Sequence, residues 1–246
     1  MRLMYANDLD SATLTALTSD PNFTVSAVQD TSIQVPWRST ALTAQTIVVD
    51  LTAAATVSCA AIAGHNFTAS ATVQIAGNAA DSWGAPSVTY TITYRSDIML
   101  VFFTAASYRY WRIYMDDQTN SNSYLQVGRA FVGEYLQVDP SSLLEFPEER
   151  TRTDTVQYSI GNQMYGDKGV EAVVYRYSFP RSDDTMKGNM ETVWTTVGRH
   201  KPIFFTNFDT TYTVIPPTYC HIAEDMTFQY LGNAEWEYSM VLREVD

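Results

Sequence analysis

"SVTYTITY" (87–94) is the stretch that decides the fold class, because its side chains alternate strictly between two chemical types. One face carries bulky side chains and the other carries threonines: Val88, Tyr90, Ile92 and Tyr94 against Thr89, Thr91 and Thr93. A period of two is typical of a β-strand with one buried face. The stretch therefore predicts a strand in a sheet whose outer face is polar and uncharged.

Further strand-like segments surround this stretch, and polar turns separate them. They are rich in β-branched and aromatic residues and cover residues 44–51, 55–64, 70–77, 98–105, 108–115 and 125–138. The segment "IMLVFFTA" (98–105) is apolar throughout, as expected for a strand buried on both faces. Many short strands without a long helix predict an antiparallel β-sandwich of the jelly-roll type for the first half.

A change of composition separates the second half of the chain from the first. "DPSSLLEFPEERTRTD" (139–154) combines two prolines with a block of charge and has no alternation. It predicts a linker, and hence domains at 1–139 and 140–246. Strands are expected at 155–160, 169–179, 202–208 and 226–245, and one helix at about 183–198. The second domain is thus predicted to be smaller and β-rich, with a single α-helix.

The charge balance excludes several classes of partner. Of 246 residues, 15 are Lys or Arg and 27 are Asp or Glu, which gives a net charge of −12. Without a basic cluster, such a chain repels nucleic-acid phosphates and anionic membrane surfaces, so neither partner is expected. No signal-peptide pattern opens the sequence, and Cys59 and Cys220 lack a CxxC spacing. We expect folding in the cytoplasm, with both thiols buried.

The sequence carries no motif of an enzyme, a metal site or a cofactor site. His65 has no second histidine at ligand spacing, and no GxSxG elbow, GxGxxG or phosphate-binding loop occurs. His221, Glu224 and Asp225 lie close in sequence but lack the helical HExxH pattern. We therefore predict a non-enzymatic protein without metal or cofactor. His65 is expected to end a strand and to tie the next loop to the backbone.

Aromatic residues are the remaining candidates for function. In "YRYWRIYM" (108–115) one face carries Trp111, Ile113 and Met115, and the other carries Tyr108, Tyr110, Arg112 and Tyr114. The tyrosine and arginine face is compatible with three roles, namely ordinary sheet packing, a protein interface or a platform for sugar rings. A sugar site would also need exposed aromatic rings around loops, with polar side chains nearby to orient the hydroxyls. The candidates for that role are Asp81, Trp83, Asp116, Asp117 and Asn120.

The acidic and polar loop "DDQTNSNS" (116–123) lacks the ligand spacing of a calcium loop. It is expected to be a solvated hairpin tip, with a calcium site or a partner contact as the open alternatives.

Five motifs of the first half together resemble a known family. They are Trp37, the Val49-Asp50-Leu51 triplet, the strand end from Ile62 to Asn66, the "YWRI" of Tyr110 to Ile113, and Gly128 to Tyr135. Over residues 25–138 the chain resembles tail-tip proteins of tailed bacteriophages that carry a discoidin-like (galactose-binding-like) jelly roll. Residues 141–246 are similar in element order to the tail-tube-like fold of phage tube and distal tail proteins, with the two domains in reversed order.

The resemblance implies a structural component of a phage tail tip or baseplate. Such a subunit forms a homo-oligomeric ring, with six copies expected, that connects the tail tube to the hub or fibres. Its implied partners are the tail tube protein and the baseplate hub or fibre proteins, and its implied location is the virion after assembly in the host cytoplasm. The alternative is a carbohydrate-binding module for host-surface attachment. The resemblance carries no sugar-binding residue over to this sequence.

Overall fold

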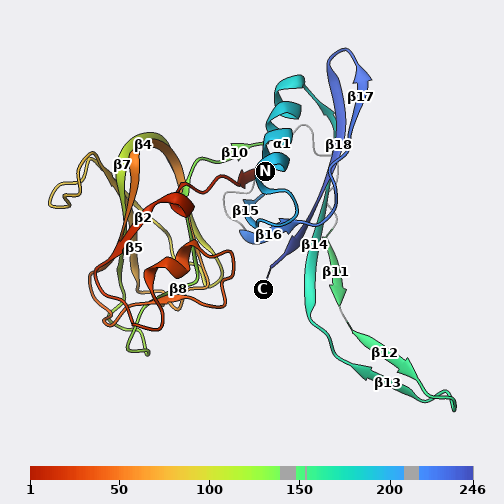
Figure 1. Ribbon diagram of the computed structural model, residues 1–246, viewed down its shortest axis with the longest axis horizontal. Coiled ribbons are helices and arrows are strands. Elements are labelled where there is room, and N and C mark those ends of the chain that lie inside the picture. The colour runs from red at the N-terminus through yellow and green to blue at the C-terminus, as the bar shows by residue number, and fades with distance from the viewer. Residues whose placement is uncertain (139–147, 153, 208–215, 246) are drawn as a thin grey trace. The chain divides into compact units, whose positions relative to one another are not determined.

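The computed structural model describes residues 1–138, 148–152, 154–207 and 216–245. The chain forms two compact units (Figure 1), which comprise Met1–Gln137 with Phe204–Tyr219, and Val138–Ile203 with Cys220–Asp246. The domain boundary expected at 139–140 lies outside the described residues and stays a prediction. The linker expected at 139–154 is wrong for residues 148–152, because they pair with residues 171–175 as a strand. No helix in the described ranges has the length and apolar character needed to cross a lipid bilayer.

The first unit is built from antiparallel strands and two short 3-10 helices. Its elements are β1 (Arg2–Met4), η1 (Asp8–Ser11), β2 (Thr13–Ala16), η2 (Val25–Gln29), β3 (Trp37–Arg38), β4 (Gln45–Ala63), β5 (Thr72–Asn78), β6 (Val88–Thr91), β7 (Met99–Asp116), β8 (Gln126–Val127), β9 (Arg129–Gly133), β10 (Leu136–Gln137) and β15 (Ile203–Thr206). The main sheet has the order β2-β4-β7-β5-β6, with β9 on β4. Two smaller pairings complete the unit: β3 lies on β8, and β1 lies between β10 and β15.

The long strands β4 and β7 organise the first unit. They pair from Gln45↔Met115 to Ile62↔Met99, and the register shifts where Leu51–Ala54 of β4 stand opposite a single residue of β7. The first part of β4 lies between β2 and β7, whereas its last part lies between β9 and β7. The pair bends on the way (Figure 1), so that both of its halves line one core.

Joining the strands in this way corrects two expectations. The sequence predicted separate strands at 44–51 and 55–64, and again at 98–105 and 108–115, but each pair forms one continuous strand. The joining residues are small and all but Ala106 are exposed, so they lack the apolar alternation that marks a strand. At the bend, Thr52 adopts a positive φ of 65°, and the Asp50 carboxylate accepts the Thr52 N–H. This local bond stabilises the bend.

Two tryptophans fill the centre of the core. Trp37 and Trp111 are both fully buried. Each still pairs its indole N–H: Trp37 Nε1 donates to Ser19 Oγ at 2.9 Å, and Trp111 Nε1 donates to the Tyr108 carbonyl at 3.3 Å. Satisfying both donors removes the cost of burying a polar group beside a large apolar surface.

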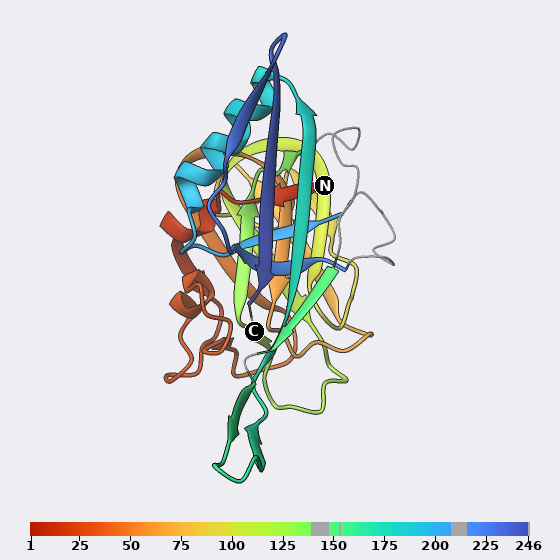
Figure 2. The same cartoon turned by 90° about the vertical axis from the view of Figure 1, so that its right-hand side faces the viewer.

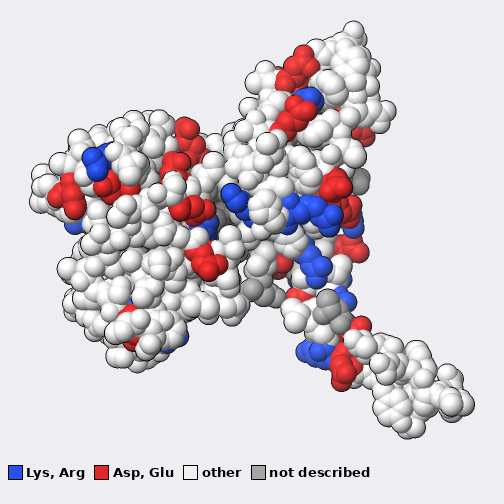
Figure 3. All heavy atoms as spheres, in the orientation of Figure 1, with Lys and Arg blue, Asp and Glu red and all other residues white. Residues whose placement is uncertain are grey.

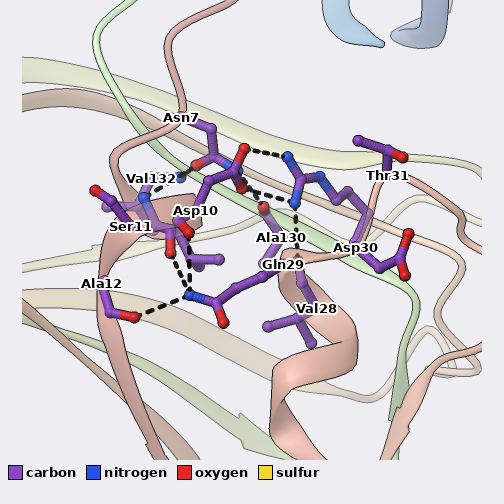
Figure 4. A network of polar contacts seen from close by, with 12 residues as sticks. Asn7, Asp10, Ser11, Ala12, Val28, Gln29, Asp30, Thr31, Ala130 and Val132 are labelled. Carbon is purple, nitrogen blue, oxygen red and sulfur yellow. Dashed lines mark hydrogen bonds and ion pairs between the residues drawn. The ribbon is translucent and has the colours of Figure 1, made fainter. Parts of the chain in front are cut away.

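A polar network ties the N-terminal segment to β9 (Figure 4). The Asn7 side chain donates to the Ala130 carbonyl at 2.9 Å and accepts the Val132 N–H at 3.0 Å, as a paired strand would. Arg129, on β9, is 3% exposed and forms a two-point ion pair with Asp10 at 2.7 and 2.8 Å. Its other described partner is the Val28 carbonyl at 3.3 Å. Asp10 thus compensates a charge that is almost wholly removed from water.

The second unit is organised by β18 (Glu235–Glu244). β18 pairs with β14 (Glu171–Ser182) on one side and with β16 (Thr218–Ile222) and β17 (Phe228–Gly232) on the other. The remaining elements are β11 (Glu148–Arg152), which pairs with β14, the hairpin of β12 (Thr155–Tyr158) and β13 (Met164–Asp167), and α1 (Asp184–Val197). Figure 2 shows β14 and β18 running side by side along the unit.

The helix lies within one residue of its predicted bounds at each end, and the region expected to be β-structure at 226–245 forms the hairpin of β17 and β18. The Asp183 carboxylate caps α1 by accepting the Met186 N–H at 2.7 Å, and Met190, Val193 and Val197 form its buried face. The hairpin turns at Asn233 and Ala234, both with positive φ, as a type I′ turn requires. The predicted fold class, mainly β with antiparallel sheets and one α-helix, is confirmed for the described residues. The likeness of the second half to a tail-tube fold stays a prediction.

Replacing Asp10 with alanine should destabilise the chain by about 3 kcal/mol, because it leaves the buried Arg129 guanidinium without its counter-charge. The measurement is urea-induced unfolding. The matched control is Glu171→Ala, which breaks the exposed ion pair with Arg150 and should cost less than about 1 kcal/mol. Equal effects of the two substitutions would contradict the role assigned to the Asp10–Arg129 pair.

Candidate binding surfaces

The outer face of β7 gathers an arginine and three aromatic rings. Tyr110, Arg112 and Tyr114 alternate with the buried Trp111, Ile113 and Met115, as the sequence predicted. Trp83, in the loop before β6, places its ring over the Arg112 guanidinium, 4.7 Å from ring centroid to Cζ. We call the group Trp83, Tyr110, Arg112 and Tyr114 the β7 face.

Arg112 is unusual because it is stacked but has no counter-charge. No carboxylate of the described residues lies within ion-pair distance of its guanidinium, and its Nε is buried without a hydrogen-bond partner. Burial lowers the pKa of Arg112, although the group stays protonated at any physiological pH. The Tyr114 ring contributes a second, longer cation–π contact at 5.8 Å. The Arg112 side chain therefore has an N–H donor without an acceptor, in a position partly shielded from water.

The predicted acidic residues nearby hold the β7 face in place. Asp81 is exposed and accepts the Trp83 indole N–H at 2.7 Å, which fixes the ring. Asp116 accepts the Ala44 N–H at 3.1 Å and the Tyr114 hydroxyl at 3.4 Å. Burial and the negative charge of Asp116 both raise the pKa of Tyr114. The structure thus brings Asp81, Trp83, Arg112, Tyr114 and Asp116 together.

Tyr108 departs from the predicted face. Its ring packs against the core and meets Trp111 edge-on, with 6.0 Å between centroids. The reason is the register shift beside it, where the β4–β7 pair bends and the strict alternation along β7 ends. Tyr108 is therefore a packing residue.

Asp117 and Asn120 also lie away from the β7 face, inside their own loop. Asp117 is 1% exposed and accepts the Thr68 N–H and Thr68 hydroxyl, both at 2.7 Å. Asn120 donates to the Asn66 carbonyl at 2.8 Å and to Asp117 at 3.2 Å. The solvated loop tip expected at 116–123 is wrong for these two side chains, because they bind the neighbouring loop.

His65 and Asn66 have the structural role that the sequence predicted. His65 Nδ1 accepts the Phe67 N–H at 3.2 Å, and its ring stacks on Phe67 at 5.0 Å. Asn66 donates to the Tyr124 carbonyl and accepts the Gln126 N–H. Burial lowers the pKa of His65, which favours its neutral form. Both residues fasten the loop after β4.

The buried thiols and the residues around His221 offer no assembled reactive site. Cys59 and Cys220 are both buried and unpaired, and burial raises the pKa of each thiol well above its usual range. Glu224 forms an ion pair with Arg176, and Asp225 forms one with Arg199. Across the described ranges, no three His, Cys, Asp or Glu side chains cluster as a metal ion would require.

A second surface, which the sequence analysis did not identify as one, is the β12–β13 hairpin. We call residues 155–167 the arm. Every residue of its two strands is exposed, and its exposed apolar side chains are Val156, Tyr158, Ile160, Met164 and Tyr165. Residues 155–166 contain no charged residue, and Figure 3 shows a wholly uncharged tip on the visible face. The absence of charge beside a Gly-Asn turn is the signal that could have identified the arm from the sequence.

Several solved structures are similar to the chain, and they include carbohydrate-binding modules. A chitosan-binding module of a chitosanase/glucanase from Paenibacillus sp. IK-5 is 24% identical, covers 52% of this chain and 99% of its own, and has a TM-score of 0.41. A family 32 module from C. perfringens, solved with galactose, is 16% identical over 55% of this chain and 100% of its own, with a TM-score of 0.43. A fucose-binding module from Streptococcus pneumoniae is 14% identical over 52% and 95%, with a TM-score of 0.43.

These TM-scores are all below 0.5, so the similarity does not by itself establish a shared function. No family model and no curated protein matches the sequence.

Replacing Asp117 with alanine should lower the free energy of unfolding by about 2–3 kcal/mol, since two donors of Thr68 and one of Asn120 lose a charged acceptor. Urea unfolding measures the loss. The matched control is Gln118→Ala, at an exposed neighbouring position, and should change stability by less than about 0.5 kcal/mol. An Asp117→Ala variant as stable as the wild type would show that the carboxylate does not hold the loop.

Proposed function

We propose that this chain is a non-catalytic binding protein whose first unit recognises carbohydrate through the β7 face. The observation that carries the proposal is Arg112, a partly buried guanidinium that is stacked under Trp83 and has no carboxylate partner in the described chain. The preferred ligands are acidic oligosaccharides, because a sugar carboxylate supplies the counter-charge that Arg112 lacks.

The surroundings of Arg112 suit a sugar better than a fully charged ligand. The residues paired with Tyr114 across the sheet are Thr46 on β4 and Gln74 on β5, both uncharged hydrogen-bonding groups. Sugar hydroxyls need such groups, while the apolar face of a sugar ring packs on aromatic rings. Trp83, Tyr110 and Tyr114 supply those rings on either side of the arginine.

Replacing Arg112 with glutamine should weaken binding of acidic oligosaccharides at least tenfold, because it removes a charge-assisted hydrogen bond worth about 1.5–3 kcal/mol. Trp83→Ala should weaken the binding of acidic and of neutral sugars to a similar extent. Titration calorimetry against galacturonate, mannuronate and neutral galactose or chitin oligosaccharides measures both effects.

The matched control is Arg38→Gln. Arg38 is also stacked on aromatic rings, Phe23 and Tyr124, but its Nε–H already donates to Gln126. We expect it to leave sugar affinity within about twofold of the wild type. A wild-type chain that binds none of these sugars at millimolar concentration refutes the proposal, and so does equal loss in the Arg38 and Arg112 variants.

A second candidate function is a structural subunit of a phage tail tip, and the exposed apolar arm is the observation that favours it. A two-stranded hairpin is marginally stable alone in water, and exposed apolar patches usually mark protein interfaces. With the resemblance of residues 25–138 to tail-tip proteins, the arm supports a ring of identical subunits, six being expected. We propose tail tube and baseplate hub or fibre proteins as its partners, and the virion as its location after assembly in the host cytoplasm.

The tail-tip function predicts self-association of the purified chain into closed rings. Light scattering after size-exclusion chromatography should give a mass that is a multiple of 27.6 kDa, and negative-stain electron microscopy should show the rings. Replacing residues 156–165 with a short Gly-Ser turn should yield monomers. A chain that stays monomeric at high protein concentration refutes this candidate.

A further inference from the structure

We propose that the arm of one copy of this chain pairs with the outer edge of β17 in a second copy. The inference rests on the second candidate function, assembly of identical subunits, and names the two surfaces that would join them. Pairing of this kind adds a strand to an open sheet edge and gains affinity from backbone hydrogen bonds.

The arm has the properties of an inserting element. β12 and β13 pair only with each other among the described strands, so each has a free edge of backbone donors and acceptors. On one face, Val156 lies on the same side as the cross-strand pair Tyr158↔Met164, and all three are about half exposed or more. Ile160, within the turn, is fully exposed. An arm that buried these side chains against a sheet would gain the stability it lacks alone.

β17 has the properties of an accepting edge. It pairs with β18 along one side, and no described strand pairs with its other side. Its sequence, Phe-Gln-Tyr-Leu-Gly, contains no charge and no proline, the devices that usually protect a sheet edge. Tyr230 and Leu231 are exposed on it.

The arm and the β17 edge lie at opposite ends of the second unit. β14 begins at Glu171, four residues after the arm, and ends at Ser182, which pairs with Trp236 beside β17. Twelve strand residues span about 35–40 Å, whereas an arm of about six residues per strand reaches roughly 20 Å. Figures 1 and 2 show the arm pointing away from the β17–β18 turn. The arm cannot reach the edge in its own chain.

Charge favours a second copy as the occupant. Two copies with a net charge of −12 each repel one another over most of their surfaces. Residues 155–166 of the arm and all of β17 carry no charged side chain, so these parts can meet without placing carboxylates opposite carboxylates. Because the two surfaces differ and lie apart, the contact is head-to-tail, and repetition of such a contact closes into a ring when the rotation allows.

The test uses full-length chains with one surface disabled in each. Val156→Lys disables the arm and Leu231→Lys disables the edge, because a lysine at either place resists burial in a new strand pair. The matched control is Val35→Lys, an equally exposed apolar residue of the first unit. Sedimentation velocity measures self-association of each variant alone and of the two variants mixed, and circular dichroism verifies that each is folded.

We expect each disabled variant to lose self-association at least tenfold and the control to match the wild type. The equimolar mixture should form heterodimers that grow no further, since each partner keeps one working surface. If Leu231→Lys still self-associates while Val156→Lys does not, the arm pairs with itself or another surface, and the inference fails while self-assembly stands. If the wild type does not self-associate, both fail.

Discussion

The antiparallel pairing of β4 with β7 is the constraint on which the first unit depends. Neither strand could bury its apolar residues alone. Buried positions alternate with less buried ones in β4 before the bend, and every position from 57 to 63 is buried after it. Pairing along nearly their whole length lets both strands turn together, and the bulge around Thr52 takes up the mismatch. β2, β5 and β9 then add to edges that this pair has already placed. The β7 face is the outward side of the same pairing.

The sequence patterns correctly predicted features that depend on residues close together in the chain. The alternation in 108–115 correctly placed Arg112 and Tyr114 on one face, and the cap at Asp183 correctly marked the start of α1. The patterns missed what depends on long-range pairing. The small, exposed residues between 51 and 55 gave no sign that one strand continues across them, because only the partner strand β7 supplies that continuity.

The candidate site was predictable in part for the same reason. The residues of one strand could be assigned to a face from their spacing, but the position of Trp83 over Arg112 results from a loop folding onto a distant strand. Asp117 and Asn120 looked like loop-surface residues because nothing in their own segment revealed that Thr68 and Asn66 would supply donors and acceptors. The arm is the opposite case. Its sequence pattern indicated a strand, but only the absence of charged residues indicated that its side chains are exposed.

The position of β1 has a consequence for the order in which the chain folds during synthesis. β1, at residues 2–4, lies between β10 and β15, and its Met4 pairs with Phe204. At 5–20 residues per second, about 10–40 s pass between the emergence of these two residues from a ribosome. Over that interval β1, with Leu3 and Met4 destined for full burial, has one edge without its final neighbour. The nascent chain must keep that edge from other strands until Phe204 has been synthesised.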